Sequence, residues 1–127
     1  MGIEDGIAQD HGHTALPAVH EMIQRLNSHL GMLLVATLAG SKDAKLPHKW
    51  ALPNGTVPEP AIRKRLELAH HTWVILMDAE TPDLARAWFI GGNPFLKGDT
   101  PLTAIREDRH QEVAVALEAF LEDRQDV

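Results

Sequence analysis

Residue types that could carry catalysis are scarce in this chain and do not gather into a catalytic pattern. The 127 residues include no cysteine, which excludes a thiol nucleophile, a disulfide scaffold and a Cys-ligated zinc. The serines, Ser28 and Ser41, lie outside any nucleophile-elbow pattern, and Gly91-Gly92 matches neither phosphate-binding glycine fingerprint. We therefore expect a protein that is not an enzyme and that uses no cofactor.

The histidines do not form a metal-binding pattern either. His70 and His71 are adjacent, so on a helix their side chains point about 100° apart and cannot grip one ion together. His11 and His13 could bind a metal adventitiously, but no carboxylate–histidine pattern surrounds them. We expect no metal site.

Positive charge is concentrated between residues 42 and 65. This stretch holds six basic and two acidic residues, a local charge of +4, whereas the whole chain has a net charge of −6. One face could therefore attract phosphate while the acidic total argues against indiscriminate binding to nucleic acid or membranes. The alternative is an ordinary solvated surface.

Residues 31–50 have the organisation of a helix-turn-helix. A short apolar helix ends at Gly40, and a second short helix, capped by Ser41 or Asp43, is expected to run to about Trp50. In such modules the second helix enters the major groove of DNA. The candidate DNA-binding residues are Lys42, Lys45, His48 and Lys49, and the three lysines would share one helix face. Similar helix pairs occur in many all-α folds, and Pro47 must then lie in the first turn of the second helix.

Helical periodicity and capping signals recur along the rest of the chain. Apolar side chains spaced by three and four residues predict helices over residues 16–30, from Pro60 to about 80, and from about 109 to 124. Three pairs place a capping side chain directly before a proline suited to the first helical position: Thr81-Pro82, Asn93-Pro94 and Thr100-Pro101. Trp88 is expected to anchor the core.

The sequence thus predicts an all-α fold, a compact bundle of about six short helices with a helix-turn-helix-like N-terminal half. An apolar share of 44% is ordinary for a globular domain, and no apolar run approaches the roughly 18 residues of a membrane span. We expect a disordered arm over 1–15, a helix-turn-helix-like region over 16–80 and a second region over 81–127. We also expect a cytoplasmic protein that does not bind membranes.

A continuous apolar run, Trp73–Met77, lies within the helix predicted from Pro60 to about residue 80. A helix that is apolar all round is either central to the fold or covered by a partner. We expect this segment to mediate a homodimer.

Residues 84–121 resemble the C-terminal domain of Xre/MbcA/ParS-type antitoxins. The matching features are an Ala-rich turn into Trp88, then Asn93-Pro94 with Leu96, then Pro101 and a helix that ends near Arg106, then a last helix with an early Val113. The family usually has glycine where this chain has Asp108, a position that is expected to need a left-handed backbone. The run around Pro47 also departs from a typical Xre recognition helix.

The resemblance implies an antitoxin for a RES-domain toxin, an enzyme that depletes NAD. Family members cover the toxin's active-site cleft with their C-terminal domain, and many also repress their own promoter by binding operator DNA. The partner-binding residues that this implies are Arg106, Arg109, Phe95 and Arg124, with the arginines expected to be exposed or to enter the cleft. The alternative is a DNA-binding regulator without a toxin partner. A small-ligand binding module would instead need a deep apolar pocket between helices.

Overall fold

The structure is a computed structural model that describes residues 15–125. Within that range the chain forms seven α-helices and one 3-10 turn, and it contains no strand. The elements are α2 (Ala15–Leu30), α3 (Met32–Ala39), α4 (Leu46–Ala51), α5 (Pro60–Ala79), α6 (Pro82–Ile90), η1 (Pro94–Leu96), α7 (Pro101–Arg106) and α8 (His110–Gln125). The all-α prediction is confirmed. The expected arm, including His11 and His13, lies outside the described residues apart from Ala15, where α2 begins.

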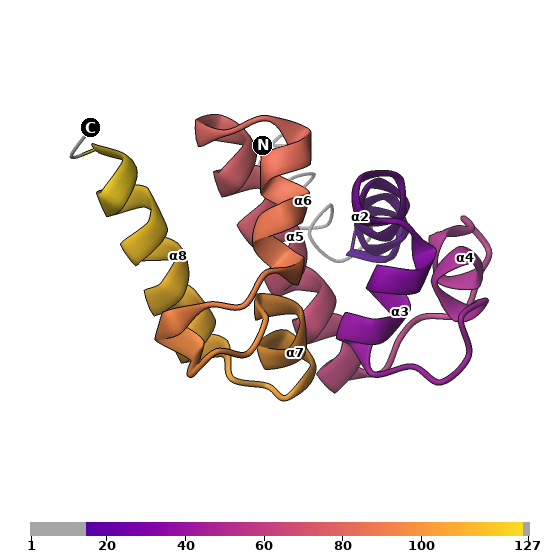
Figure 1. Cartoon of the computed structure of the whole chain (residues 1–127). Coiled ribbons are helices and arrows are strands. Elements are labelled where there is room, and N and C mark those ends of the chain that lie inside the picture. The colour runs from indigo at the N-terminus through magenta and orange to yellow at the C-terminus, as the bar shows by residue number, and fades with distance from the viewer. Residues whose placement is uncertain (1–14, 126–127) are drawn as a thin grey trace, which may run out of the picture.

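The long helix α5 is the centre of the bundle. It contacts α2 and α3 on one side and α6, α7 and α8 on the other, and Figure 1 shows α4 and α8 at opposite ends of the molecule. The predicted apolar stripe faces the core, with Leu66, Ala69, Trp73 and Leu76 buried. The run at Trp73–Met77 is therefore central, and only Val74 is largely exposed, at 52%. Burial within the fold accounts for its apolar character, and the homodimer expected through it stays a prediction.

The three Thr/Asn-Pro pairs begin three helical segments, as the sequence predicts. The Thr81 hydroxyl accepts from the Leu84 N–H at 3.4 Å, the Asn93 Oδ1 from the Phe95 N–H at 2.9 Å, and the Thr100 hydroxyl from the Thr103 N–H at 3.0 Å. Each cap satisfies an N–H that the helix itself cannot bond, and each proline occupies a position where no N–H is needed.

The second helix of the expected helix-turn-helix begins later than predicted. Gly40 ends α3 in a left-handed conformation (φ 79°) as expected, but α4 begins only at Leu46. Neither Ser41 nor Asp43 caps α4; their side chains instead bond within the preceding turn. An earlier start would bring Pro47 into the helix interior, where its ring would clash with the carbonyl four residues before it.

Helix α4 is held against α2 by its buried side. Trp50 is 3% exposed, its carbonyl hydrogen-bonds with the His20 ring, and the Asn27 amide donates to the Pro47 carbonyl at 2.9 Å. These contacts fix the orientation of a helix that is too short to be stable alone.

One arginine of α5 joins the two halves of the fold. Arg65 donates through Nε and Nη2 to the two carboxylate oxygens of Asp108, at 2.8 and 3.0 Å, and through Nη1 to the Ala39 carbonyl at 2.7 Å. Its hydrogen bond holds the pKa of Asp108 below its usual range. Asp108 has φ 62°, which confirms the left-handed backbone expected at the position where the antitoxin family has glycine. A side chain at Gly40 would collide with Arg65, since its Cβ would lie 2.7 Å from Nη1.

Replacing Thr100 by Ala is expected to lower the free energy of unfolding by about 1 kcal/mol, because the Thr103 N–H loses its cap. Thr81→Ala should cost less, since that cap is longer and exposed. Chemical denaturation measures both, with Thr100→Ser as the control that keeps the hydroxyl. Equal losses for Thr100→Ala and Thr100→Ser would contradict the capping role.

Candidate partner-binding site

An apolar groove lies between the end of α6, the η1 turn and the C-terminal half of α8. It has a volume of about 400 Å³. Its lining combines three aromatic rings with small side chains and few polar groups: Trp88, Asn93, Pro94, Phe95, Ala116, Ala119, Phe120 and Asp123. Open clefts of this composition are where proteins commonly receive an apolar group.

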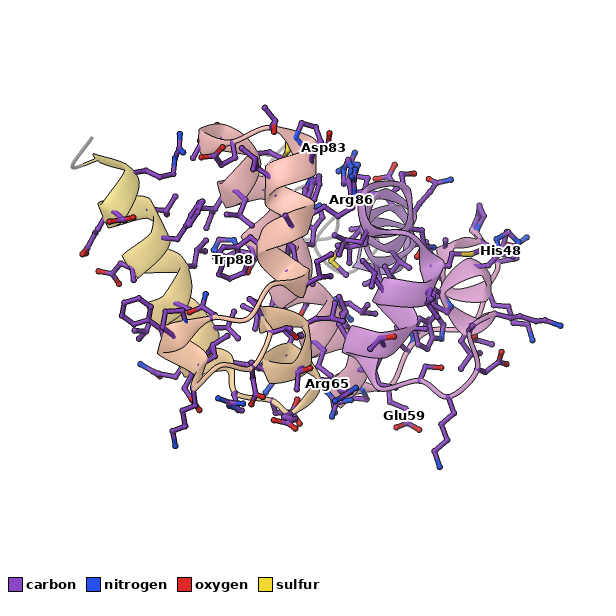
Figure 2. All side chains as sticks on the ribbon, viewed as in Figure 1. His48, Glu59, Arg65, Asp83, Arg86 and Trp88 are labelled. Atoms are coloured by element: carbon purple, nitrogen blue, oxygen red, sulfur yellow. The ribbon has the colours of Figure 1, made fainter. Side chains whose placement is uncertain are left out.

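Local structure positions each aromatic ring of the groove. Trp88 and Arg86 lie on opposite sides of α6 because they are two residues apart on a helix, and Figure 2 shows Trp88 directed toward α8 and Arg86 toward α2. Trp88 packs edge-on against Phe89, with ring centres 5.5 Å apart, and its ring centre lies 6.5 Å from that of Phe120. In the η1 turn Leu96 is fully buried, which leaves Phe95 on the outside at 56% exposure.

Trp88 is the expected core anchor, but its indole N–H is unsatisfied. The side chain is 9% exposed, and Nε1 is enclosed without a hydrogen-bond partner among the described residues. A buried donor that loses its partner costs about 1–3 kcal/mol. Such a group at the lining of a groove is a candidate contact for a bound molecule that brings an acceptor.

The C-terminal half of α8 carries three exposed acidic side chains. Asp123 belongs to the groove lining, Glu122 precedes it, and Glu118 lies on the opposite face of the helix. None of the three forms an ion pair within residues 15–125. The nearby cation, Arg124, is instead paired with Glu80, whose side chain is only 7% exposed. Arg124 therefore takes part in a contact between α8 and the end of α5, and its role in binding a partner stays a prediction.

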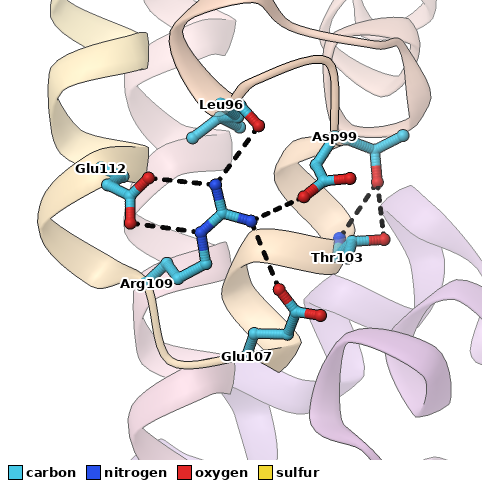
Figure 3. A network of polar contacts seen from close by, with 7 residues as sticks. Leu96, Asp99, Thr103, Glu107, Arg109 and Glu112 are labelled. Atoms are coloured by element: carbon cyan, nitrogen blue, oxygen red, sulfur yellow. Dashed lines mark hydrogen bonds and ion pairs between the residues drawn. The ribbon is translucent and has the colours of Figure 1, made fainter.

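Arg109, expected to be exposed, is occupied within the chain. Its side chain is 19% exposed, and all five N–H groups are bonded (Figure 3). Nε and Nη2 donate to the Glu112 carboxylate, Nη1 to the Asp99 and Glu107 carboxylates, and Nη2 also to the Leu96 carbonyl. The prediction of an exposed Arg109 is wrong, because the carboxylates of Asp99, Glu107 and Glu112 surround its guanidinium in the folded chain. The same hydrogen bonds hold the pKa of Glu112 below its usual range.

Of the four partner-binding residues predicted from the sequence, one lines the groove. Phe95 does so, whereas Arg106 is exposed at the end of α7 beside Gly40. Sequence reasoning treated Trp88 as core and did not single out Phe120 or Asp123 for binding. Phe120 and Asp123 share one face of α8 with Ala116 and Ala119, as the helical spacing of these four residues predicts.

The four candidate DNA-binding side chains are all exposed at the other end of the molecule. Lys42 and Lys45 precede α4, whereas His48 and Lys49 lie within it. The three lysines therefore do not share one helix face, and the prediction that they would is wrong. None of the four forms an ion pair within the described residues.

Two histidines, His29 and His70, lie near arginine side chains where α2, α5 and α6 meet. The ring of His29 stacks on Trp73 with centres 4.6 Å apart, and Arg86 donates to the His29 carbonyl at 2.9 Å. Burial lowers the pKa of His29 below its usual range, and the charges of Arg86 and Arg25 lower it further. Burial likewise lowers the pKa of His70, with Arg25, His29 and His71 adding to the effect.

Within residues 15–125 no group of three or more His, Asp or Glu side chains is arranged to hold a metal ion. No helix among these residues combines the length and the apolar character needed to cross a membrane.

The free energy of unfolding is expected to fall as the pH is lowered from about 8 to about 5. The folded-state pKa values of His29 and His70 lie below the ordinary value of 6.5, so the unfolded chain binds more protons in this range. The contribution of these two histidines to the free energy of unfolding is present above pH 6.5. It is lost as the pH falls from 6.5 to below their lowered folded-state pKa values. Denaturation across this range measures the slope.

His70→Gln should make that slope shallower, and His71→Gln, at an exposed neighbouring position, is the matched control. A slope that is unchanged in His70→Gln and in a His29→Gln variant would contradict the assignment.

Replacing Arg109 by Ala is expected to lower Tm far more than replacing the exposed Arg106 by Ala, because only Arg109 binds η1 and the start of α8 together. Arg109→Lys should be intermediate, since an ammonium cannot reproduce the planar five-donor geometry. Thermal unfolding followed by circular dichroism measures all three. Similar Tm values for the two alanine variants would show that the network around Arg109 does not stabilise the fold.

No protein-family model, curated protein or solved structure matches this chain.

Proposed function

We propose that the chain is a cytoplasmic, non-enzymatic protein that binds a partner protein through the groove between α6, η1 and α8. The observation that carries this proposal is an exposed Phe95 in an apolar groove where the buried Trp88 N–H has no acceptor among residues 15–125. Exposed aromatic rings beside a cleft are characteristic anchors of protein–protein interfaces.

The partner that the sequence favours is a RES-domain toxin. The groove is built from Trp88, Asn93-Pro94 and the last helix, which are the residues that carry the resemblance to antitoxins. An interface of standard size buries about 800 Å² on each partner, which is enough to cover the mouth of an active-site cleft. Neutralisation then requires no chemistry from this chain, only tight binding over the toxin's active site.

Co-expression with the RES-domain enzyme encoded nearest to this gene tests the proposal. The enzyme alone should deplete cellular NAD and arrest growth, and the intact chain should restore both. Phe95→Asp should abolish protection, because it introduces a charge at the apolar anchor. Val115→Asp, on an equally exposed residue of α8 outside the groove lining, should preserve it. Failure of the intact chain to protect, or equal protection by the two variants, would contradict the proposal.

A second candidate function, DNA binding, is favoured by the exposed and unpaired cluster at Lys42, Lys45, His48 and Lys49. A DNA-binding regulator with this cluster would contact about three to five phosphates and release their counterions, because the cluster offers few cations. Changing the three lysines to alanine should abolish operator binding and leave toxin neutralisation intact. Retained operator binding in the triple variant would exclude this cluster as the DNA interface.

A further inference from the structure

We infer that the occupant of this groove is a basic amphipathic segment of the partner, a class of ligand fixed by three features of the groove. The inference rests on the proposed function and identifies the chemistry of the bound segment. An apolar side chain of the segment fills the space between Trp88, Phe95 and Phe120. Its flanking Lys or Arg side chains meet the acidic end of α8.

The first feature is a slot of apolar surface with a small-residue wall. Ala116 and Ala119 on α8 leave room opposite Trp88, and the half-buried Phe120 and the exposed Phe95 lie at its sides. Two alanines in place of larger residues keep the space open along one face of the helix. A branched or aromatic side chain fits this composition, whereas a polar one would lose its hydrogen bonds to water.

The second feature is the indole N–H of Trp88. It is enclosed by protein and has no acceptor among the described residues. Because the Trp88 side chain lines the groove, a small shift of the surrounding side chains on binding would bring a carbonyl oxygen of the occupant within reach of this donor. Peptide backbone supplies such an acceptor at every residue, so a polypeptide satisfies the N–H while its side chain fills the slot.

The third feature is the charge along the groove. Asp123 lies in the lining and the exposed Glu122 precedes it on α8, and neither carboxylate is paired within the described part of the chain. Lys97 follows η1 at the opposite end of the groove, where it influences Glu112. Cations of the bound segment are therefore attracted to the Asp123 end, and nucleic acids or acidic peptides are repelled there.

Two synthetic amphipathic helices test this assignment: one of leucine and lysine, and a twin in which every lysine is glutamate. The probe of binding is the indole N–H signal of Trp88 in the ¹⁵N-labelled full chain, identified by its loss in Trp88→Phe. The lysine peptide should move this signal downfield as the hydrogen bond forms. It should also bind at least about tenfold more tightly than the glutamate twin, a difference that shrinks as salt is added.

A pair of charge reversals on α8 locates the contact. Asp123→Lys should weaken binding of the lysine peptide severalfold, whereas Glu118→Lys, with the same change of charge on another face of the helix, should have a much smaller effect. Circular dichroism establishes that both variants remain folded. Phe95→Asp should abolish the movement of the indole signal.

The outcomes separate this inference from the proposed function. Equal affinity for both peptides, equal effects of the two charge reversals, or an unmoved indole signal would overturn the basic segment as occupant. If the chain still restores NAD and Phe95→Asp still abolishes protection, the groove remains the partner site with an occupant of different chemistry. Loss of protection by the intact chain would contradict the proposed function itself.

Discussion

The attachment of α8 by Arg109 is the constraint on which the C-terminal half of the structure depends. The guanidinium immediately precedes α8 and bonds to the Leu96 carbonyl of η1, to Asp99 and to Glu112. Buried Val113 and Leu117 then pack α8 into the core. This fixes the N-terminal half of the helix, whereas the C-terminal half is bordered by grooves of about 400 and 390 Å³ and is tied to the end of α5 by the pair of Arg124 with Glu80.

Charge is distributed along the molecule in a way that matches this division. The lysines around α4 lie at one end and the carboxylates of α8 at the other, as Figure 1 shows for the two helices. The central ion pair of Arg65 and Asp108 joins the α5 helix to the turn before α8, and the Arg65 contact to Ala39 extends this connection to α3. Two surfaces of opposite sign are thereby held on one rigid core, so that a phosphate-binding role and a cation-binding role would not compete for the same face.

Local chemistry made much of this fold predictable from the sequence. The three Thr/Asn-Pro pairs begin helical segments at the expected residues, because a cap and its proline act within three residues of each other. The apolar stripe from Leu66 to Leu76 was predictable from helical periodicity, which neighbouring residues determine. The left-handed backbone at Asp108 was expected only from the glycine that the resembling family carries there.

The predictions that were wrong concern groups that interact through the tertiary structure. The fit of Pro47 into the first turn set the start of α4 and placed Lys42 and Lys45 outside it. Arg109 was expected to be exposed, but the folded chain brings Asp99 against its guanidinium, just as it brings Glu80 to the exposed Arg124. The groove could not be anticipated either, since Trp88, Phe95 and Phe120 come from three separate elements.

Hydrogen–deuterium exchange of the full chain, alone and in complex with the co-expressed RES-domain enzyme, tests the central claim most directly. The account predicts slower exchange on binding within residues 88–96 and 116–124, with residues 42–51 unchanged. Protection confined to residues 42–51, or unchanged exchange along α6, η1 and α8 in the complex, would contradict it.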